Sequence, residues 1–252
     1  MSKAFVSALS EDERPRVYLR AVIALVSACS AFEYFAILKR VLASGIVPLP
    51  FLDFLPRLPL TWLPAFITCW LLLALLFIKR REFGFLLVPF IFYALLMDER
   101  SYSNHSYLLG LVVFLLAAGW ERLLPFQISA VYLFSALAKL NLEYMSGDVL
   151  SAFIAAPRLP APLYSLIATA SIVTEIFVAV ALWLPALRRL GFFTAAFIHI
   201  GMILLLVPLT LLGKFQLVEF ATLMLSCYYY VLATPRHNQQ NNHHLSDTAI
   251  RV

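Results

Sequence analysis

Long apolar segments separated by short polar stretches occupy the chain from about residue 18 to about residue 234. A membrane-spanning helix needs about 20 mostly apolar residues, with a range of about 17–25. Eight such segments are predicted: 18–38, 58–78, 83–99, 103–121, 123–140, 162–185, 190–208 and 214–234. The second carries no charge at all, whereas the third and fifth are short. The pattern therefore predicts an all-α fold, a polytopic transmembrane helical bundle of about eight spans.

The composition places the chain among membrane proteins. Of its 252 residues, 62% are hydrophobic and 13% are charged, whereas soluble domains average about 45–50% and about 25%. A chain of this kind cannot cover its apolar surface with polar groups, so that surface is expected to face lipid. The net charge of +5 does not indicate nucleic acid, because the cations lie in short loops and form no basic stripe. The lipid bilayer is the predicted partner.

The loop cations predict an orientation. Cytoplasmic loops of membrane proteins are enriched in Lys and Arg. Placing both termini in the cytoplasm puts most of the 19 Lys and Arg residues on that side: Lys3, Arg14, Arg16, Arg20, Lys79, Arg80, Arg81, Arg122, Arg188, Arg189, Arg236 and Arg251. The chain is then divided into a cytoplasmic N-terminal segment (1–17), a transmembrane domain (18–234) and a disordered polar tail (235–252).

Neither the cysteines nor the terminal histidines predict a metal site. Cys29, Cys69 and Cys227 lie in separate apolar segments without a CxxC pair, which favours small core residues. The run from His237 to His244 is rich in Asn, Gln and His, but a solvated tail offers no packed scaffold to fix ligands. No metal is therefore expected.

Ionisable groups at apolar depth are the candidate functional residues, because burying each one costs a few kcal/mol on insertion scales. Lys139 ends the fifth segment, Glu175 lies in the middle of the sixth and His199 in the middle of the seventh. Glu33 and Glu219 are comparable cases in the first and eighth. A dense polar cluster, Ser103-Asn104-His105-Ser106-Tyr107, opens the fourth segment.

The order of the segments suggests one site on the non-cytoplasmic side. His105 follows the loop between segments three and four, and Lys139 precedes the loop between segments five and six. Desolvation disfavours the ammonium form of a lysine and lowers its pKa, and a neutral lysine can act as a general base. Asn104 and His105 could donate hydrogen bonds to an oxygen that loses its proton. A phenol or hydroquinone is the matching lipid-soluble acid.

Each of these residues also has a structural interpretation. Lys139 at a helix end could extend to the membrane interface. Asn104 could cap a helix with His105 in its first turn. Glu175 and His199 could satisfy each other's hydrogen bonds. The residues alone leave these alternatives open.

Four segments, in this order, resemble motifs of the vitamin K-dependent gamma-carboxylase family. They are Pro50-Phe51-Leu52-Asp53-Phe54-Leu55-Pro56-Arg57-Leu58-Pro59-Leu60-Thr61-Trp62, Asn104-His105-Ser106-Tyr107-Leu108, Tyr132 through Lys139-Leu140-Asn141 to Gly147, and Phe197-Ile198-His199-Ile200-Gly201-Met202 with Gly213-Lys214-Phe215. The resemblance covers residues 15 to 235. The broader group is the horizontally transferred transmembrane (HTTM) superfamily.

The resemblance implies a quinone site. The lysine that matches Lys139 is the base that deprotonates vitamin K hydroquinone in the carboxylases, and the residues matching Asn104 and His105 belong to the same lumenal pocket. Tyr107, Asn141, Glu175 and His199 are then expected to contact the cofactor, which is reduced vitamin K or another quinol. The family oxidises the quinol to an epoxide and couples this reaction to glutamate carboxylation.

Departures from the family leave two functional classes open. The carboxylases have a large C-terminal domain after the membrane part, whereas only about 18 polar residues follow it here. One hypothesis is a membrane enzyme, a carboxylase- or epoxidase-like lyase, that oxidises a quinol and is coupled to carboxylation or proton abstraction on an acceptor. The alternative is a non-catalytic quinone- or lipid-binding scaffold for a separately encoded soluble partner or peptide substrate.

Overall fold

The computed structural model describes residues 13–45, 54, 56–98, 103–154, 159–205 and 211–234. Every element in these ranges is helical, as predicted. The α-helices are α2 (Glu13–Ser44), α3 (Leu63–Lys79), α4 (Gly84–Leu96), α5 (Asn104–Ala118), α6 (Leu124–Ala138), α7 (Leu142–Met145), α8 (Asp148–Phe153), α9 (Ala161–Ala181), α10 (Arg188–Leu205) and α11 (Leu211–Ala233). Short 3-10 helices η1 (Leu60–Trp62), η2 (Arg81–Phe83) and η4 (Glu121–Leu123) connect some of them. The predicted tail, with its histidines, lies outside the described residues.

Each of the eight predicted segments overlaps one of the longer helices. Among the described residues, four helical stretches are long and apolar enough to cross a membrane: Glu13–Ser44, Leu60–Lys79, Ala161–Ala181 and Phe215–Ala233. The helices α4, α5 and α6 have 13, 15 and 15 residues. At 1.5 Å per residue, 15 residues extend about 22 Å, which is less than the hydrocarbon core of about 30 Å. Four helices of the described part thus have the length and apolar composition of membrane spans, and eight spans stays a prediction.

Proline and glycine set several helix ends. Proline lies at the first or second position of α3, α6 and α9, where its missing N–H and fixed φ do not disturb the helix. Gly119 ends α5 in the left-handed conformation, with φ of 71°. α2 (Glu13–Ser44) extends beyond both ends of the predicted segment 18–38.

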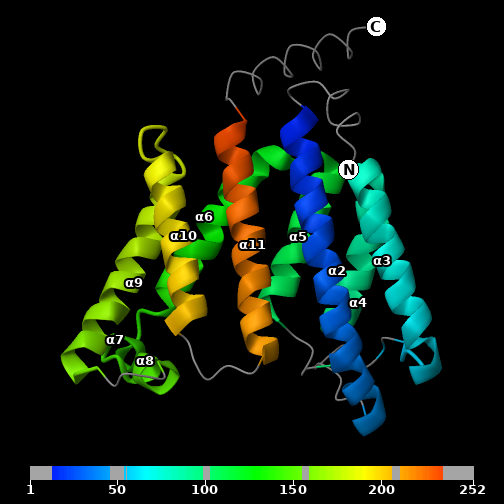
Figure 1. Ribbon diagram of the computed structural model, residues 1–252, viewed down its shortest axis with the longest axis horizontal. Coiled ribbons are helices and arrows are strands. Elements are labelled where there is room, and N and C mark those ends of the chain that lie inside the picture. The colour runs from blue at the N-terminus through cyan, green and yellow to red at the C-terminus, as the bar shows by residue number, and fades with distance from the viewer. Residues whose placement is uncertain are drawn as a thin grey trace, which may run out of the picture. The chain divides into compact units, whose positions relative to one another are not determined.

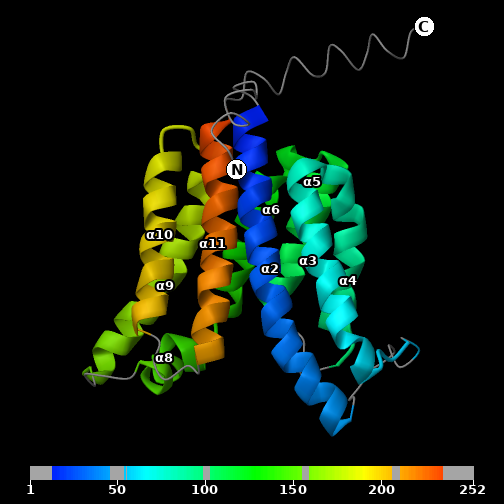
Figure 2. The same ribbon diagram turned by 45° about the vertical axis from the view of Figure 1, so that its right-hand side comes forward.

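The chain divides into two compact units (Figures 1 and 2). Unit 1 covers residues 1–121 and contains α2 to α5, and unit 2 covers residues 122–252 and contains α6 to α11. Within unit 1, α2 packs against α3 and α5, and α4 packs against α3 and α5. Within unit 2, α9 packs against α6 and α10, and α11 packs against the same two helices. Each unit is thus a closed arrangement of four longer helices.

The core of unit 1 is built around an aromatic pair between α2 and α3. The rings of Tyr34 and Trp70 are fully buried, with centroids 5.8 Å apart. The Trp70 indole N–H donates a 2.8 Å hydrogen bond to the Ser27 hydroxyl. At Gly84, an added Cβ would lie 2.8 Å from the Ala117 Cβ, so the absence of a side chain permits close packing of α4 on α5.

In unit 2, polar side chains bond across neighbouring helices. The exposed Trp183 indole donates to the Ser129 hydroxyl at 2.8 Å, and that hydroxyl donates to the Ala179 carbonyl at 2.9 Å. Tyr228 is fully buried, and its hydroxyl donates to the Arg188 carbonyl at 3.2 Å. The first bonds connect α6 with α9, and the last connects α11 with α10.

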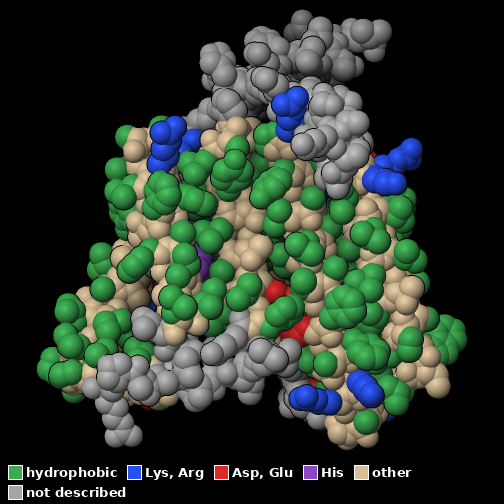
Figure 3. Space-filling view, in the orientation of Figure 1, with side chains coloured by type: hydrophobic (Ala, Val, Ile, Leu, Met, Phe, Trp, Pro, Cys, Tyr) green, Lys and Arg blue, Asp and Glu red, His purple; other side chains and the backbone are tan. Residues whose placement is uncertain are grey.

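The outer surface has the distribution expected of a lipid-facing protein. On the side of α2 and α3 visible in Figure 3, blue Lys and Arg side chains lie near the helix ends and green hydrophobic side chains cover most of the stretch between them. Leu25, Leu72 and Leu75 are among the exposed large apolar residues. Cys69 is exposed as well, so its interpretation as a core residue is wrong; Cys227 is buried.

Candidate functional site

Three polar side chains lie on one face of α6 and its C-terminal end. Tyr132, Ser135 and Lys139 are spaced at i, i+3 and i+7, which places them along one side of a helix. Lys139 is the residue directly after the last helical position, and its backbone still has right-handed helical angles. The side chain therefore continues the row begun by Tyr132.

Lys139 forms an ion pair with Glu175 of α9. Its Nζ donates to the Glu175 Oε1 at 2.5 Å, and the Ser135 hydroxyl donates to the same oxygen at 3.1 Å. The side chain of Lys139 is 21% exposed and that of Glu175 is 4% exposed. Lys139 thus turns toward the protein, and the alternative in which it extends to the interface is wrong.

His199 of α10 is paired with Tyr132, not with Glu175. The Tyr132 Oη and the His199 Nε2 are 2.8 Å apart, and both side chains are buried. The alternative in which Glu175 and His199 satisfy each other is therefore wrong. The two pairs are neighbours, because Tyr132 and Lys139 lie on the same face of α6. We call these five residues of unit 2, namely Tyr132, Ser135, Lys139, Glu175 and His199, the unit-2 cluster.

Two buried polar atoms of the unit-2 cluster have no hydrogen-bond partner among the described residues. They are the Glu175 Oε2 and the His199 Nδ1. Buried polar groups in folded proteins are nearly always hydrogen-bonded, because an unpaired one costs about 1–3 kcal/mol. The first is an acceptor on a carboxylate, and the second can donate or accept according to the tautomer. The cluster therefore retains hydrogen-bonding capacity for a ligand hydroxyl or carbonyl.

Short helix α7 encloses the cluster from one side. The ring of Tyr144 lies beneath the Lys139 Nζ, which is 5.5 Å from the ring centroid, a cation–π distance. The Tyr144 hydroxyl is 2.8 Å from the Ser171 hydroxyl on α9, one helical turn before Glu175. Asn141 caps α7: its side chain accepts from the Tyr144 N–H at 2.9 Å and donates to the Ala138 carbonyl at 2.9 Å. The structure thus gives Asn141 a capping role that the sequence did not predict.

In unit 1, His105 has a carboxylate partner of its own. Its Nε2 lies 3.3 Å from the Glu33 Oε2, and both side chains are buried. The neighbouring residue Asn104 is exposed and is the first residue of α5, whereas Ser103 holds the N-cap position. The interpretation of Asn104 as the helix cap is therefore wrong. The Ser103 hydroxyl donates to the Ser106 hydroxyl at 2.8 Å.

Tyr107 faces outward from unit 1. It is 45% exposed, and its ring packs edge-to-face on Phe92 with centroids 5.8 Å apart. Of the seven predicted site residues, Lys139, Glu175 and His199 thus lie in the unit-2 cluster, with Asn141 next to it. Asn104, His105 and Tyr107 belong to unit 1.

Four residues of this region are not predicted site residues: Tyr132, Ser135, Tyr144 and Ser171. In the sequence, Tyr132 stands out only as the start of a motif, and the other three do not stand out. The spacing of Tyr132, Ser135 and Lys139 is a signal that could have found the first two, and Ser171 lies four residues before Glu175. Tyr144 has no comparable sequence signal, because its approach to Lys139 depends on the turn at Asn141.

No family model matches the chain, and neither a curated protein nor a solved structure matches it. The resemblance to the gamma-carboxylase motifs therefore stays a prediction.

Proposed function

We propose that the protein is an integral membrane enzyme that removes a proton from a reduced quinone, or a similar lipid-soluble phenol, at the unit-2 cluster. The observation that carries this proposal is the Lys139–Glu175 ion pair, an amine and a carboxylate 2.5 Å apart between helices of an apolar unit. Paired ionisable groups at such depth are expensive, and they are typical of proton-handling sites.

The proton chemistry of this pair is consistent with the predicted role of Lys139 as base. Transfer of one proton from the Nζ to the Oε1 would leave a neutral amine and a neutral carboxylic acid, with no change in net charge. The amine can then accept the proton of a substrate hydroxyl. The substrate anion would be left beside a newly formed ammonium, which stabilises it, while Glu175 keeps the first proton.

Tyr132 and His199 supply a second hydrogen-bonding pair for the same ligand. A quinol carries two oxygens on opposite sides of its ring, so it can form hydrogen bonds to two polar groups at once. We propose that one oxygen bonds to the Lys139 Nζ and that the other bonds to the His199 Nδ1, which has no partner among the described residues.

The direct test is consumption of reduced vitamin K by the purified protein in the presence of oxygen, with the epoxide detected by mass spectrometry. K139A is expected to lower the rate at least about a hundredfold, the usual size of a general-base contribution. K39A removes an exposed lysine of α2 in unit 1 and serves as the matched control with an unchanged rate. Normal turnover by K139A would overturn the proposal. Quinone binding by the wild-type protein without turnover would favour the non-catalytic scaffold instead.

A further inference from the structure

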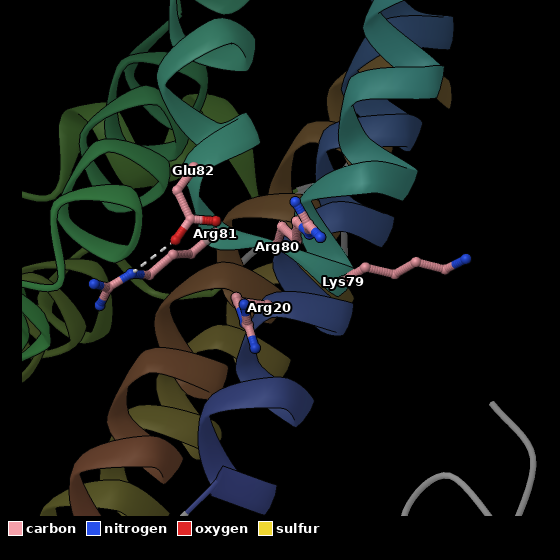
Figure 4. A pocket seen from close by; sticks show the side chains of 5 residues that line it. All are labelled: Arg20, Lys79, Arg80, Arg81 and Glu82. Atoms are coloured by element: carbon pink, nitrogen blue, oxygen red, sulfur yellow. Dashed lines mark ion pairs between the residues drawn. The ribbon is translucent and has the colours of Figure 1, made fainter.

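A basic pocket lies at one end of unit 1, far along the chain from the unit-2 cluster. Arg20, Lys79, Arg80, Arg81 and Glu82 line a cavity of about 450 Å³, within the size range of sites that hold small ligands. Arg20 comes from α2, and the other four residues come from the end of α3 and the start of η2 (Figure 4). Four of the five side chains are cationic, and we call this cavity the basic pocket.

Arg20 has an unused donor in this pocket. Its side chain is half-buried, and its Nε has no hydrogen-bond partner among the described residues. A guanidinium stays charged in proteins, so this N–H has to be satisfied by an acceptor. Oxyanions that offer two oxygens at once, such as phosphate and carboxylate, are the acceptors that match the planar guanidinium fork.

The single carboxylate of the pocket does not neutralise it. Glu82 pairs with Arg81, with 3.5 Å between the Glu82 Oε1 and the Arg81 Nε, and both side chains are largely exposed. Lys79 and Arg80 are exposed and form no ion pair with any residue that the structure describes. In Figure 4, Lys79 extends to one side and the Arg81 guanidinium to the opposite side, and Arg20 and Arg80 lie between them.

The backbone at Gly119 leaves room for the Arg81 side chain. Gly119 ends α5 next to Arg81, and a Cβ added at Gly119 would lie 2.6 Å from the Arg81 Nη1. The glycine therefore lets the guanidinium pack directly on the end of α5. Arg20 also lies within electrostatic range of Arg81, a like charge, and of the carboxylates of Glu13, Glu82 and Glu121.

The surroundings indicate a lipid as the source of the anion. The pocket begins where the apolar stretch of α3 ends, and Leu72, Leu75 and Leu76 in the preceding turns are exposed. Acyl chains could lie along these leucines while their headgroup meets the arginines. Basic pockets at helix ends of membrane proteins bind phosphate-bearing headgroups in this way.

We propose that the basic pocket binds the phosphate of an anionic membrane lipid, with the half-buried Arg20 as the anchor and the exposed Arg80 and Arg81 at the rim. This site is separate from the quinol proposal and does not depend on it. Phosphate is also available in free form, so the experiment distinguishes the two sources.

The test measures lipid retention by the purified full-length protein, using native mass spectrometry after exchange into mixtures of phosphatidylglycerol and phosphatidylcholine. The wild-type protein is expected to retain phosphatidylglycerol about tenfold in preference to phosphatidylcholine, and R20Q to lose that preference. R81Q, which changes an exposed residue and carries little folding risk, is expected to lower retention severalfold. R40Q removes an exposed arginine near the other end of α2 and is expected to change nothing.

Three outcomes would overturn the proposal. They are an absence of headgroup preference in the wild-type protein, an equal loss in R40Q, and unchanged retention in both R20Q and R81Q. A parallel measurement with inorganic phosphate distinguishes a lipid headgroup from a free phosphate ion as the ligand. If phosphate raises the melting temperature of the wild-type protein but not of R20Q, while phosphatidylglycerol is not retained, the pocket binds a free anion and the lipid assignment is wrong.

Discussion

At the scale of single residues, the partner of each buried charge decides what that charge can do. Lys139, Glu175 and His199 were all recognisable in the sequence as ionisable groups in apolar segments. Their pairing was not, since it depends on which helices become neighbours. Because α6 packs on α9, Lys139 forms an ion pair with Glu175. Tyr132, on the same face of α6, forms a hydrogen bond with His199. The same reasoning applies to His105, whose buried partner Glu33 lies 72 residues earlier in the chain.

The Lys139–Glu175 pair leads to a stability prediction. K139M leaves a buried carboxylate without its cation and is expected to destabilise the protein by about 3 kcal/mol. The double variant K139M/E175L removes both charges and is expected to be more stable than K139M by about 1 kcal/mol or more. Reversible unfolding in a graded detergent mixture measures both differences. A double variant less stable than K139M would show that the two side chains do not act as a pair.

S135A is the matched control at the same site. It removes one neutral donor to the Glu175 Oε1 and keeps the ion pair. The expected loss is about 0.5–1.5 kcal/mol, the usual net contribution of one hydrogen bond. The same unfolding measurement applies, and a loss as large as that of K139M would contradict the assignment of the main contribution to the ion pair.

At the scale of elements, apolar segment length predicts where helices form better than where they cross a membrane. All eight predicted segments contain a helix because each is long, apolar and bounded by polar residues, proline or glycine. The number of crossings could not be fixed in the same way. A hydropathy profile sums the apolar character of successive residues and does not show where a helix ends. The helices α4 and α6 are therefore several residues shorter than the apolar segments from which they were predicted.

The sequence also could not predict α7 and α8, the two short helices that follow Lys139. Their positions depend on a capping bond at Asn141 and on a left-handed backbone at Gly147, with φ of 87°. Segments of four and six residues carry too little periodicity to be recognised. These elements hold Tyr144 under Lys139, so the least predictable part of unit 2 encloses its polar cluster.

Gly147 offers a test of how α7 and α8 dock on α9. A Cβ at this position would lie 2.5 Å from the Tyr164 Cβ and 2.7 Å from the Ser165 backbone nitrogen, in a conformation that other residues rarely adopt. G147A is therefore expected to destabilise the protein by about 2 kcal/mol or more. G201A in α10, where an added Cβ would meet nothing within 4 Å, should be neutral or stabilising by up to about 1 kcal/mol. Thermal unfolding of both variants checks the contrast, and equal stability would contradict the close contact with α9.

At the scale of the whole molecule, the charge distribution predicts a topology. The cations of the basic pocket lie at one end of unit 1, whereas Lys39 and Arg40 lie in the second half of α2, near its other end. Because α2 and the stretch Leu60–Lys79 are long and apolar enough to cross a membrane, the two sets of cations are expected on opposite sides. The excess of Lys and Arg in cytoplasmic loops predicts that the pocket lies on the cytoplasmic side.

Accessibility of single cysteines tests this topology. In a variant whose three native cysteines are replaced by alanine, R40C should react with a membrane-impermeant maleimide in intact cells, and K79C should react only after the cells are opened. Labelling of both positions from the same side would contradict a membrane-crossing role for α2 and α3. The reverse pattern would keep the crossings and invert the predicted orientation.

The central claim is that the unit-2 cluster holds a quinol, and photolabelling tests it most directly. The purified protein is irradiated with an azido-quinone, and the modified peptides are identified by mass spectrometry with and without excess reduced vitamin K. The account predicts labels on the α6, α9 and α10 segments that contain Tyr132, Glu175 and His199, and it predicts that the competitor removes them. Labels that lie elsewhere, or that persist under competition, would contradict the quinol site.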